Sequence, residues 1–304
     1  VATMPTVGHR EDVVIRILTS GDPISFNQLG LTKRNQQVFE RALKSPYGLV
    51  LVVGPTGSGK TTTLHSGLAT INSSNRKIWT AEDPVEITQT GLRQVQINPK
   101  IGFTFAAALR SFLRLDPDVI MVGEMRDEET AGIAVEASLT GHLVFSTLHT
   151  NSAPETVTRL LEMGLDPYRF SDSLLCVLAQ RLARRLCSSC KEVYTPSQLE
   201  LDDLLDEYGR NEFAATGIDP ATITLVRAHG CEQCGQSGYK GRLGIHEVLE
   251  AGDQLKYLIK RRADTDDIRN QAVQDGMTSL KQDGILKVIQ GLTDIHEIRR
   301  VCIK

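Results

Sequence analysis

The feature that most constrains this chain is a glycine-rich loop between a short apolar segment and a helix-forming one. Residues 54–61 match the pattern G-x-x-x-x-G-K-[ST] at every position. Residues 49–53 before them are predicted to form a buried strand, and residues 62–71 after them a helix. In such a loop the backbone N–H groups turn toward phosphate oxygens, and the helix N-terminus and Lys60 add positive charge. The sequence therefore predicts a nucleotide phosphate site, with the Thr61 hydroxyl holding Mg²⁺. The predicted ATP-binding residues are Gly54, Pro55, Thr56, Gly57, Ser58, Gly59, Lys60, Thr61 and Thr62.

Apolar strand-like segments alternate with helical ones through the first two thirds of the chain. The alternation predicts an α/β fold in which helices cover a mostly parallel sheet. The strand-like segments are residues 49–53, 77–80, 118–122 and 143–147, and the helical ones are residues 31–43, 103–115, 128–139 and 153–163.

Composition narrows the class of protein further. The 304 residues carry a formal charge of -3, so the chain lacks the basic balance of a dedicated nucleic-acid binder. The longest apolar runs are far shorter than the roughly 18 residues that span a bilayer, so we expect membrane contact only through partners. No secretory signal is recognisable, and the first residue is Val, which favours a fragment of a longer protein.

Changes in residue composition along the sequence divide the chain into four expected parts. Residues 1–22 contain a strand-like run at 13–18 and then loop residues, and we interpret them as the remnant of a preceding domain and its linker. Residues 23–186 form the expected nucleotide-binding core. Residues 187–240 form a small cysteine-bearing module, and residues 241–304 a helical C-terminal region.

Two acidic positions are candidates for acting on the phosphates. Glu124 closely follows the apolar segment 118–122. At this position an enzyme with a phosphate loop orients water or holds the Mg²⁺ shell. Glu82 and Asp83 follow the strand-like segment 77–80 and form the second acidic site, in which Glu82 is the candidate. His149 follows another predicted strand, and ligand crevices form at the carboxyl ends of such strands, so it is expected near the γ-phosphate. For each of these side chains a purely structural role is the alternative.

Four segments in this order resemble the secretion ATPases, and more narrowly those of type II secretion and type IV pilus assembly. The segments are GPTGSGKTTT at 54–63, TAEDPVE at 80–86, VGEMRD at 122–127 and TGHLVFSTLH at 140–149. They resemble the family's Walker A motif, Asp box, Walker B motif and His box. The family's Walker B motif has a glycine before the glutamate, and Gly123 precedes Glu124 in the same way here.

The resemblance implies a RecA-like P-loop domain and a set of roles and partners. Glu124 would be the catalytic carboxylate, with Glu82 supporting water or Mg²⁺ and His149 near the γ-phosphate. The family works as homo-oligomers, usually hexamers, on an inner-membrane platform protein, so a cytoplasmic location peripheral to the inner membrane is implied. Arg16 matches best an arginine that reaches the phosphates from the N-terminal domain. A surface arginine is its alternative.

Cys187, Cys190, Cys231 and Cys234 form two C-x-x-C pairs, a ligand set that suits Zn²⁺. The spacer between the pairs is longer than usual, so redox-active pairs or unpaired thiols stay open from spacing alone. The resemblance favours structural zinc, because pilus assembly and secretion members carry such a module and retraction members generally do not.

Two other functions compete with the ATPase motor. A RecA-like nucleic-acid translocase would need basic, aromatic-bearing loops, which the composition disfavours. A nucleotide-binding scaffold with slow turnover would fit a fragment that lacks accelerating arginines. Arg181, Arg184 and Arg185 are expected on a helix, as a solvated face or a subunit contact, with a nucleic-acid or lipid patch as the alternative. The shared motor motifs leave type II secretion and type IV pilus assembly both open.

Overall fold

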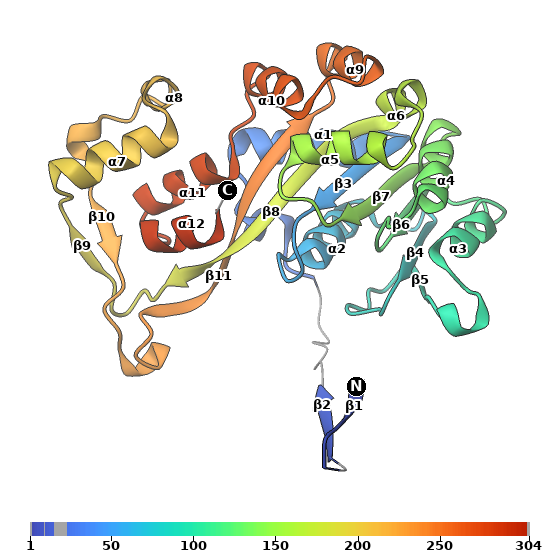
Figure 1. Cartoon of the computed structure of the whole chain (residues 1–304), viewed down its shortest axis with the longest axis horizontal. Coiled ribbons are helices and arrows are strands. Elements are labelled where there is room, and N and C mark those ends of the chain that lie inside the picture. Colours follow the sequence, from blue (N-terminus) through green and yellow to red (C-terminus); the bar gives the residue numbers. More distant parts are fainter. Residues whose placement is uncertain (1, 9, 15–22, 303–304) are drawn as a thin grey trace.

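The computed structural model describes residues 2–8, 10–14 and 23–302, and a seven-stranded sheet lies at its centre (Figure 1). The strands follow the order β11-β8-β3-β7-β6-β4-β5. All neighbours pair in parallel except β8 and β11, which pair antiparallel. The α/β fold with a mostly parallel sheet is thus confirmed. The strands are β3 Gly48–Val53, β4 Ile78–Glu82, β5 Arg93–Gln96, β6 Val119–Val122, β7 Leu143–Leu148, β8 Leu174–Leu186 and β11 Tyr239–Glu250.

Helices cover both faces of this sheet, as β3 illustrates. Its residues alternate between two apolar clusters, with Leu49, Leu51 and Val53 in one and Val50 and Val52 in the other. The first cluster includes side chains from α3 to α6, α9 and α10, and the second includes side chains from α1 and α2. A strand buried on both faces explains the unbroken apolar run. These helices are α1 Lys33–Lys44, α2 Lys60–Ile71, α3 Phe105–Phe112, α4 Glu128–Leu139, α5 Ala153–Glu162, α6 Pro167–Ser173, α9 Asp253–Lys260 and α10 Thr265–Gln274.

Strand β8 is where the sequence-based expectation was wrong. Arg181, Arg184 and Arg185 lie on this strand, not on a helix. Their segment is rich in Leu, Ala, Gln and Arg, which favour helices, but pairing with β3 and β11 decides its conformation. Residues 241–250, grouped by sequence with a helical region, likewise belong to strand β11.

Beyond the sheet, β8 and β11 continue as a two-stranded ribbon toward a smaller lobe (Figure 1). A third apolar cluster joins the lobe's α7 and β10 to α11 and α12. The remaining elements here are β9 Glu192–Tyr194, α7 Gln198–Tyr208, α8 Arg210–Ala214, β10 Leu225–Arg227, α11 Leu280–Ile289 and α12 Ile295–Val301. Short 3₁₀ turns are η1 Phe26–Leu29, η2 Pro99–Ile101, η3 Pro220–Thr222 and η4 Glu232–Cys234.

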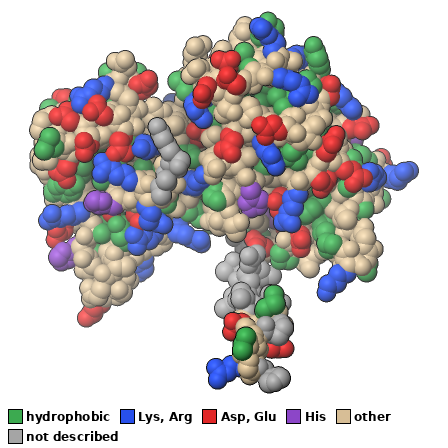
Figure 2. Space-filling model, in the orientation of Figure 1, with side chains coloured by type: hydrophobic (Ala, Val, Ile, Leu, Met, Phe, Trp, Pro, Cys, Tyr) green, Lys and Arg blue, Asp and Glu red, His purple; other side chains and the backbone are tan. Residues whose placement is uncertain are grey.

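The N-terminal segment forms a hairpin of β1 Ala2–Thr6 and β2 Arg10–Val14. The rest of the strand-like run at 13–18, including Arg16, lies outside the described residues. In the part of the chain that the structure describes, no helix has both the length and the apolar character needed to cross a membrane. Figure 2 shows acidic and basic side chains interspersed over the visible face, with basic ones gathered between the two lobes.

Candidate functional site

The phosphate loop leaves β3 at Gly54 and enters α2 at Lys60, as the motif predicts. Gly54, Gly57 and Gly59 have φ values of 147°, 79° and 89°. Residues with a Cβ rarely adopt these angles, so this loop conformation strongly favours glycine at these places. A buried strand on one side and a helix on the other fix both ends of the loop.

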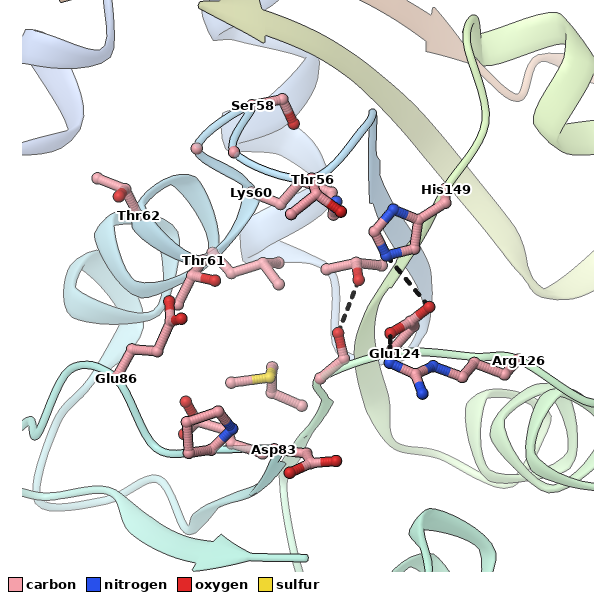
Figure 3. A pocket seen from close by; sticks show the side chains of 18 of the residues that line it. Thr56, Ser58, Lys60, Thr61, Thr62, Asp83, Glu86, Glu124, Arg126 and His149 are labelled. Carbon is pink, nitrogen blue, oxygen red and sulfur yellow. Dashed lines mark hydrogen bonds and ion pairs between the residues drawn. The ribbon is translucent and has the colours of Figure 1, made fainter. Parts of the chain in front are cut away.

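A cavity of about 410 Å³ opens beside this loop (Figure 3). Of the nine predicted ATP-binding residues, those from Thr56 to Thr62 line it, whereas Gly54 and Pro55 do not. Glu82, Glu124 and His149 line the same cavity. The fold therefore brings together three side chains that come from the ends of β4, β6 and β7.

Lys60 lies across its own loop. Its Nζ donates to the carbonyl oxygens of Gly54 at 2.7 Å and Pro55 at 3.2 Å. Burial, opposed in part by the negative charge of Glu124, lowers the pKa of Lys60 below its usual value. Gly54 and Pro55 thus contribute by holding the lysine at the mouth of the cavity.

Glu124 lies between a histidine and an arginine (Figure 3). His149 Nε2 lies 3.2 Å from one carboxylate oxygen, and Arg126 Nη2 lies 2.7 Å from the other. The bond to Glu124 raises the pKa of Arg126 above its usual value. The Glu124 side chain is only 16% exposed, so the carboxylate is held in one place at the edge of the cavity.

Glu82 is more deeply embedded, with 3% of its surface exposed. Its carboxylate accepts hydrogen bonds from Thr80 at 2.7 Å and Gln94 at 3.0 Å, and His65 Nε2 lies 3.2 Å from its other oxygen. Burial alone would raise the pKa of Glu82, but these hydrogen bonds lower it below its usual value. The network fits a carboxylate that orders the loop after β4 as well as one that faces the cavity.

Sequence reasoning missed several residues that line this cavity. Glu86 lies in the segment that already contained the acidic pair Glu82 and Asp83, so a search for further carboxylates there would have found it. Arg126 belongs to the segment that contained Glu124. Arg242 comes from β11, about 180 residues after the loop, and carries no local signal.

A second cavity of about 580 Å³ shares Gly59, Thr62 and Arg242 with the first. Leucine side chains from four separate segments line it, together with polar groups such as Gln28 and Gln290. The leucines are Leu29, Leu31, Leu182, Leu243 and Leu292. The two cavities therefore meet at the start of α2, one with several acidic and basic side chains in its wall and one with mixed apolar and polar walls.

The four predicted zinc-binding cysteines converge at the tip of the β8–β11 ribbon. Their sulfur atoms all lie within 4.8 Å of one another. Three of the Sγ–Sγ distances are 3.9, 3.8 and 3.7 Å. Four sulfurs placed tetrahedrally about 2.3 Å from a Zn²⁺ ion would lie about 3.8 Å apart. The backbone N–H groups of Cys231 and Gly238 also donate to Cys234 Sγ, each at 3.2 Å, which favours a thiolate. The donor set and its geometry fit a closed Cys₄ metal site.

Comparison with known proteins gives the same family over almost the whole chain. Residues 1–300 match the family described as Type II/IV secretion system protein. The Type II secretion system ATPase E of Vibrio cholerae serotype O1 is 48% identical over 302 residues, which cover 99% of this chain and 58% of that protein. The Type IV pilus assembly ATPase PilB of Myxococcus xanthus is 46% identical over 302 residues, which cover 98% of this chain and 51% of that protein.

A solved structure agrees with these relatives. The crystal structure of the pilus retraction motor PilT with bound ADP superposes with a TM-score of 0.68 at 28% identity, covering 94% of this chain and 68% of that one. This chain spans little more than half the length of the two curated relatives. Matching sequence and fold together place the chain in the type II/IV secretion system protein family.

Proposed function

We propose that this chain binds and hydrolyses ATP with Mg²⁺, as the motor part of a machine for type II secretion or type IV pilus assembly. The observation that carries the proposal is the convergence of the phosphate loop, Glu124 and His149 on one cavity. Relatives named for the two systems match at nearly the same identity, 48% and 46%, so the proposal covers both.

The roles follow from where each side chain lies. Backbone N–H groups from Gly57 to Thr61 cradle the phosphates, and Lys60 turns from the loop carbonyls to them. Glu124, held by Arg126 and His149, orients the attacking water. His149 is placed to respond to the γ-phosphate because it shares its contact with the water-orienting carboxylate.

The Mg²⁺ ion would be held through oxygen atoms. The cavity offers the Thr61 hydroxyl and the carboxylates of Glu82, Asp83, Glu86 and Glu124, a donor set that suits a hard cation. When bound, the ion would neutralise charge that develops on the phosphates. We propose Thr61 as the direct ligand, with Glu82 or Glu124 acting through water.

The nucleobase would occupy the second cavity. This cavity meets the phosphate cavity at Gly59 and Thr62, and its mixed apolar and polar walls suit an aromatic ring with hydrogen-bonding edges. Arg242 lines both cavities and is placed to contact the nucleotide between its base and its phosphates.

The cysteine module, residues 187–240, would carry a structural Zn²⁺ ion. Its four sulfurs would occupy every position of a tetrahedral zinc site, so no position would be open for a substrate. The ion would then stabilise the ribbon tip and take no part in hydrolysis.

Assembly would complete the active site. We propose a homo-oligomer, a hexamer, in which Arg16 of one subunit reaches the phosphates and stabilises their developing charge. The ring would act from the cytoplasmic side on an inner-membrane platform protein, through which all membrane contact would run. No nucleic acid would take part.

Phosphate release with Mg-ATP at several protein concentrations tests this proposal. We expect the rate to rise more than linearly with concentration in this chain, and to be abolished in both Lys60→Ala and Arg16→Ala. A rate that is linear in protein concentration and unchanged in Arg16→Ala would refute the proposed role of the arginine. A rate that is unchanged in Lys60→Ala would refute ATP hydrolysis at this loop.

A further inference from the structure

We propose that Gln180 is a positioning residue for the phosphate loop, whose side-chain amide holds the loop in the shape that receives phosphates. The proposal rests on nucleotide binding at this loop. Gln180 lies on β8, far from the loop in sequence, and is 3% exposed. It lies outside the motifs that identify the nucleotide site, and it also lines the second cavity.

The register of the sheet places Gln180 where the loop begins. Strands β3 and β8 pair in parallel up to Val53 and Ala179. The next residue on β3 is Gly54, the first of the loop, and the next on β8 is Gln180. The loop therefore leaves the sheet directly beside this side chain.

The Gln180 amide contacts both the loop and the first turn of α2. Its Nε2 donates to the Ser58 carbonyl oxygen at 2.8 Å. Its Oε1 accepts from the Thr63 hydroxyl at 2.6 Å. Because a carbonyl oxygen can only accept, the amide has one favourable orientation, with nitrogen toward Ser58 and oxygen toward Thr63.

Two loop glycines pack against Gln180 without space for a side chain. A Cβ at Gly54 would lie 2.4 Å from the backbone carbonyl oxygen of Gln180, and a Cβ at Gly59 would lie 2.8 Å from its side-chain Nε2. Both distances are shorter than normal contacts. Gln180 therefore lies directly against the loop at its first residue, Gly54, and at its last glycine, Gly59.

Fixing the Ser58 carbonyl also fixes the peptide groups next to it. The loop binds phosphates through peptide N–H groups, so their direction before the ligand arrives determines how much order must be gained on binding. Without the amide, the Ser58 carbonyl and the Thr63 hydroxyl would be buried and unpaired, and the loop would relax to satisfy them. Loss of the Gln180 side chain should therefore lower the affinity for nucleotide as well as the stability of the fold.

The experiment uses the whole 304-residue chain and a fluorescent ATP analogue. Gln180→Met keeps the length of the side chain and removes both hydrogen bonds, and Thr63→Val removes one of them. The matched control is Thr293→Val, which removes a buried hydroxyl that donates to the carbonyl of Arg184, also on β8 but away from the loop. Thermal stability, the Kd of the analogue and the kcat and KM of phosphate release are measured for each variant.

We expect Gln180→Met to raise the Kd by about tenfold or more, the usual scale for leaving buried polar groups unpaired. Thr63→Val should have a smaller effect in the same direction. Thr293→Val should lose thermal stability with an unchanged Kd. Adding Thr63→Val to Gln180→Met should cost little more, because both changes break one shared contact.

A Gln180→Met chain that loses stability like Thr293→Val but binds the analogue within twofold of the parent would overturn the positioning role. Lys60→Ala separates this failure from failure of the proposed function. If the parent and Lys60→Ala bind the analogue equally, the loop is no nucleotide site, and both proposals fall together.

Discussion

The carboxylate of Glu297 ties α12 to strand β8, and its contribution to stability can be worked out from its surroundings. It accepts the backbone N–H of Arg184 at 3.1 Å, and it pairs with the guanidinium groups of Arg184 and Arg300 at 2.5 and 2.7 Å. The Glu297 side chain is 2% exposed. Burial would raise the pKa of Glu297, but the bonds from Arg300 and Arg184 hold it at about 2, against an ordinary value of 4.5.

This depressed pKa converts into a free energy of unfolding. A carboxyl that titrates at 4.5 in the unfolded chain and at about 2 in the folded one stabilises the fold by about 3 kcal/mol at pH 7. Because the folded pKa is the lower one, the contribution is complete above the unfolded pKa and disappears as the pH falls through the folded one. At pH 3.5 about 2 kcal/mol should remain.

Urea unfolding of Glu297→Gln, followed by circular dichroism at pH 7 and pH 3.5, measures this contribution. We expect a loss of about 3 kcal/mol at pH 7 and about 2 kcal/mol at pH 3.5 relative to the parent. Asp206→Asn is the control, since Asp206 pairs with Arg210 in the same way but in solvent, and its loss should be much smaller. A loss for Glu297→Gln that is equal at both pH values would refute the electrostatic account and assign the effect to packing.

Three further predictions concern the nucleotide and cysteine sites. Glu124→Gln should bind the fluorescent ATP analogue normally while phosphate release falls by about a hundredfold or more, and equal loss of binding and turnover would contradict its role toward water. Cys231→Ser should lower the bound zinc, measured by metal analysis, from one ion per chain, and should make the cysteine module sensitive to protease; a parent chain free of zinc would remove the basis of this prediction. Gly54→Ala should weaken analogue binding more than Gly57→Ala, because an added Cβ meets another backbone only 2.4 Å away at Gly54 and nothing within 4 Å at Gly57; the reverse order would mean that backbone conformation alone governs the loop.

The parts of this molecule that were predictable from sequence carry their signal locally. Residues 49–53 and 119–122 are apolar because each strand is covered on both faces, so composition and length reveal them. The phosphate loop is a motif of consecutive residues, 54–61, so it can be recognised directly in the sequence. Glu124 and His149 follow neighbouring parallel strands, β6 and β7, whose carboxyl ends lie at one edge of the sheet, so their meeting in one cavity follows from the same pattern.

Other parts of the structure depend on pairing between segments distant in sequence, so no local sequence pattern predicts them. Residues 174–186 are rich in helix formers, and their position between β3 and β11 makes them a strand. Arg242 reaches the cavity because β11 returns alongside β8. The contacts of Gln180 exist because β3 and β8 share one register, and no window of sequence around residue 180 contains that information.

The cysteine cluster lies at the end of the β8–β11 ribbon. Past the end of β3, β8 pairs with β11 alone among the described strands, and apolar side chains of this ribbon pack against α11 and α12. Cys187 follows the last residue of β8, and Cys231 and Cys234 precede β11, whose first residue, Tyr239, pairs with the end of β8. Joining these cysteines closes the ribbon at its open end, so loss of one thiol should fray it from Tyr239 inward. The sheet around β3 has its own two apolar clusters and should stay folded.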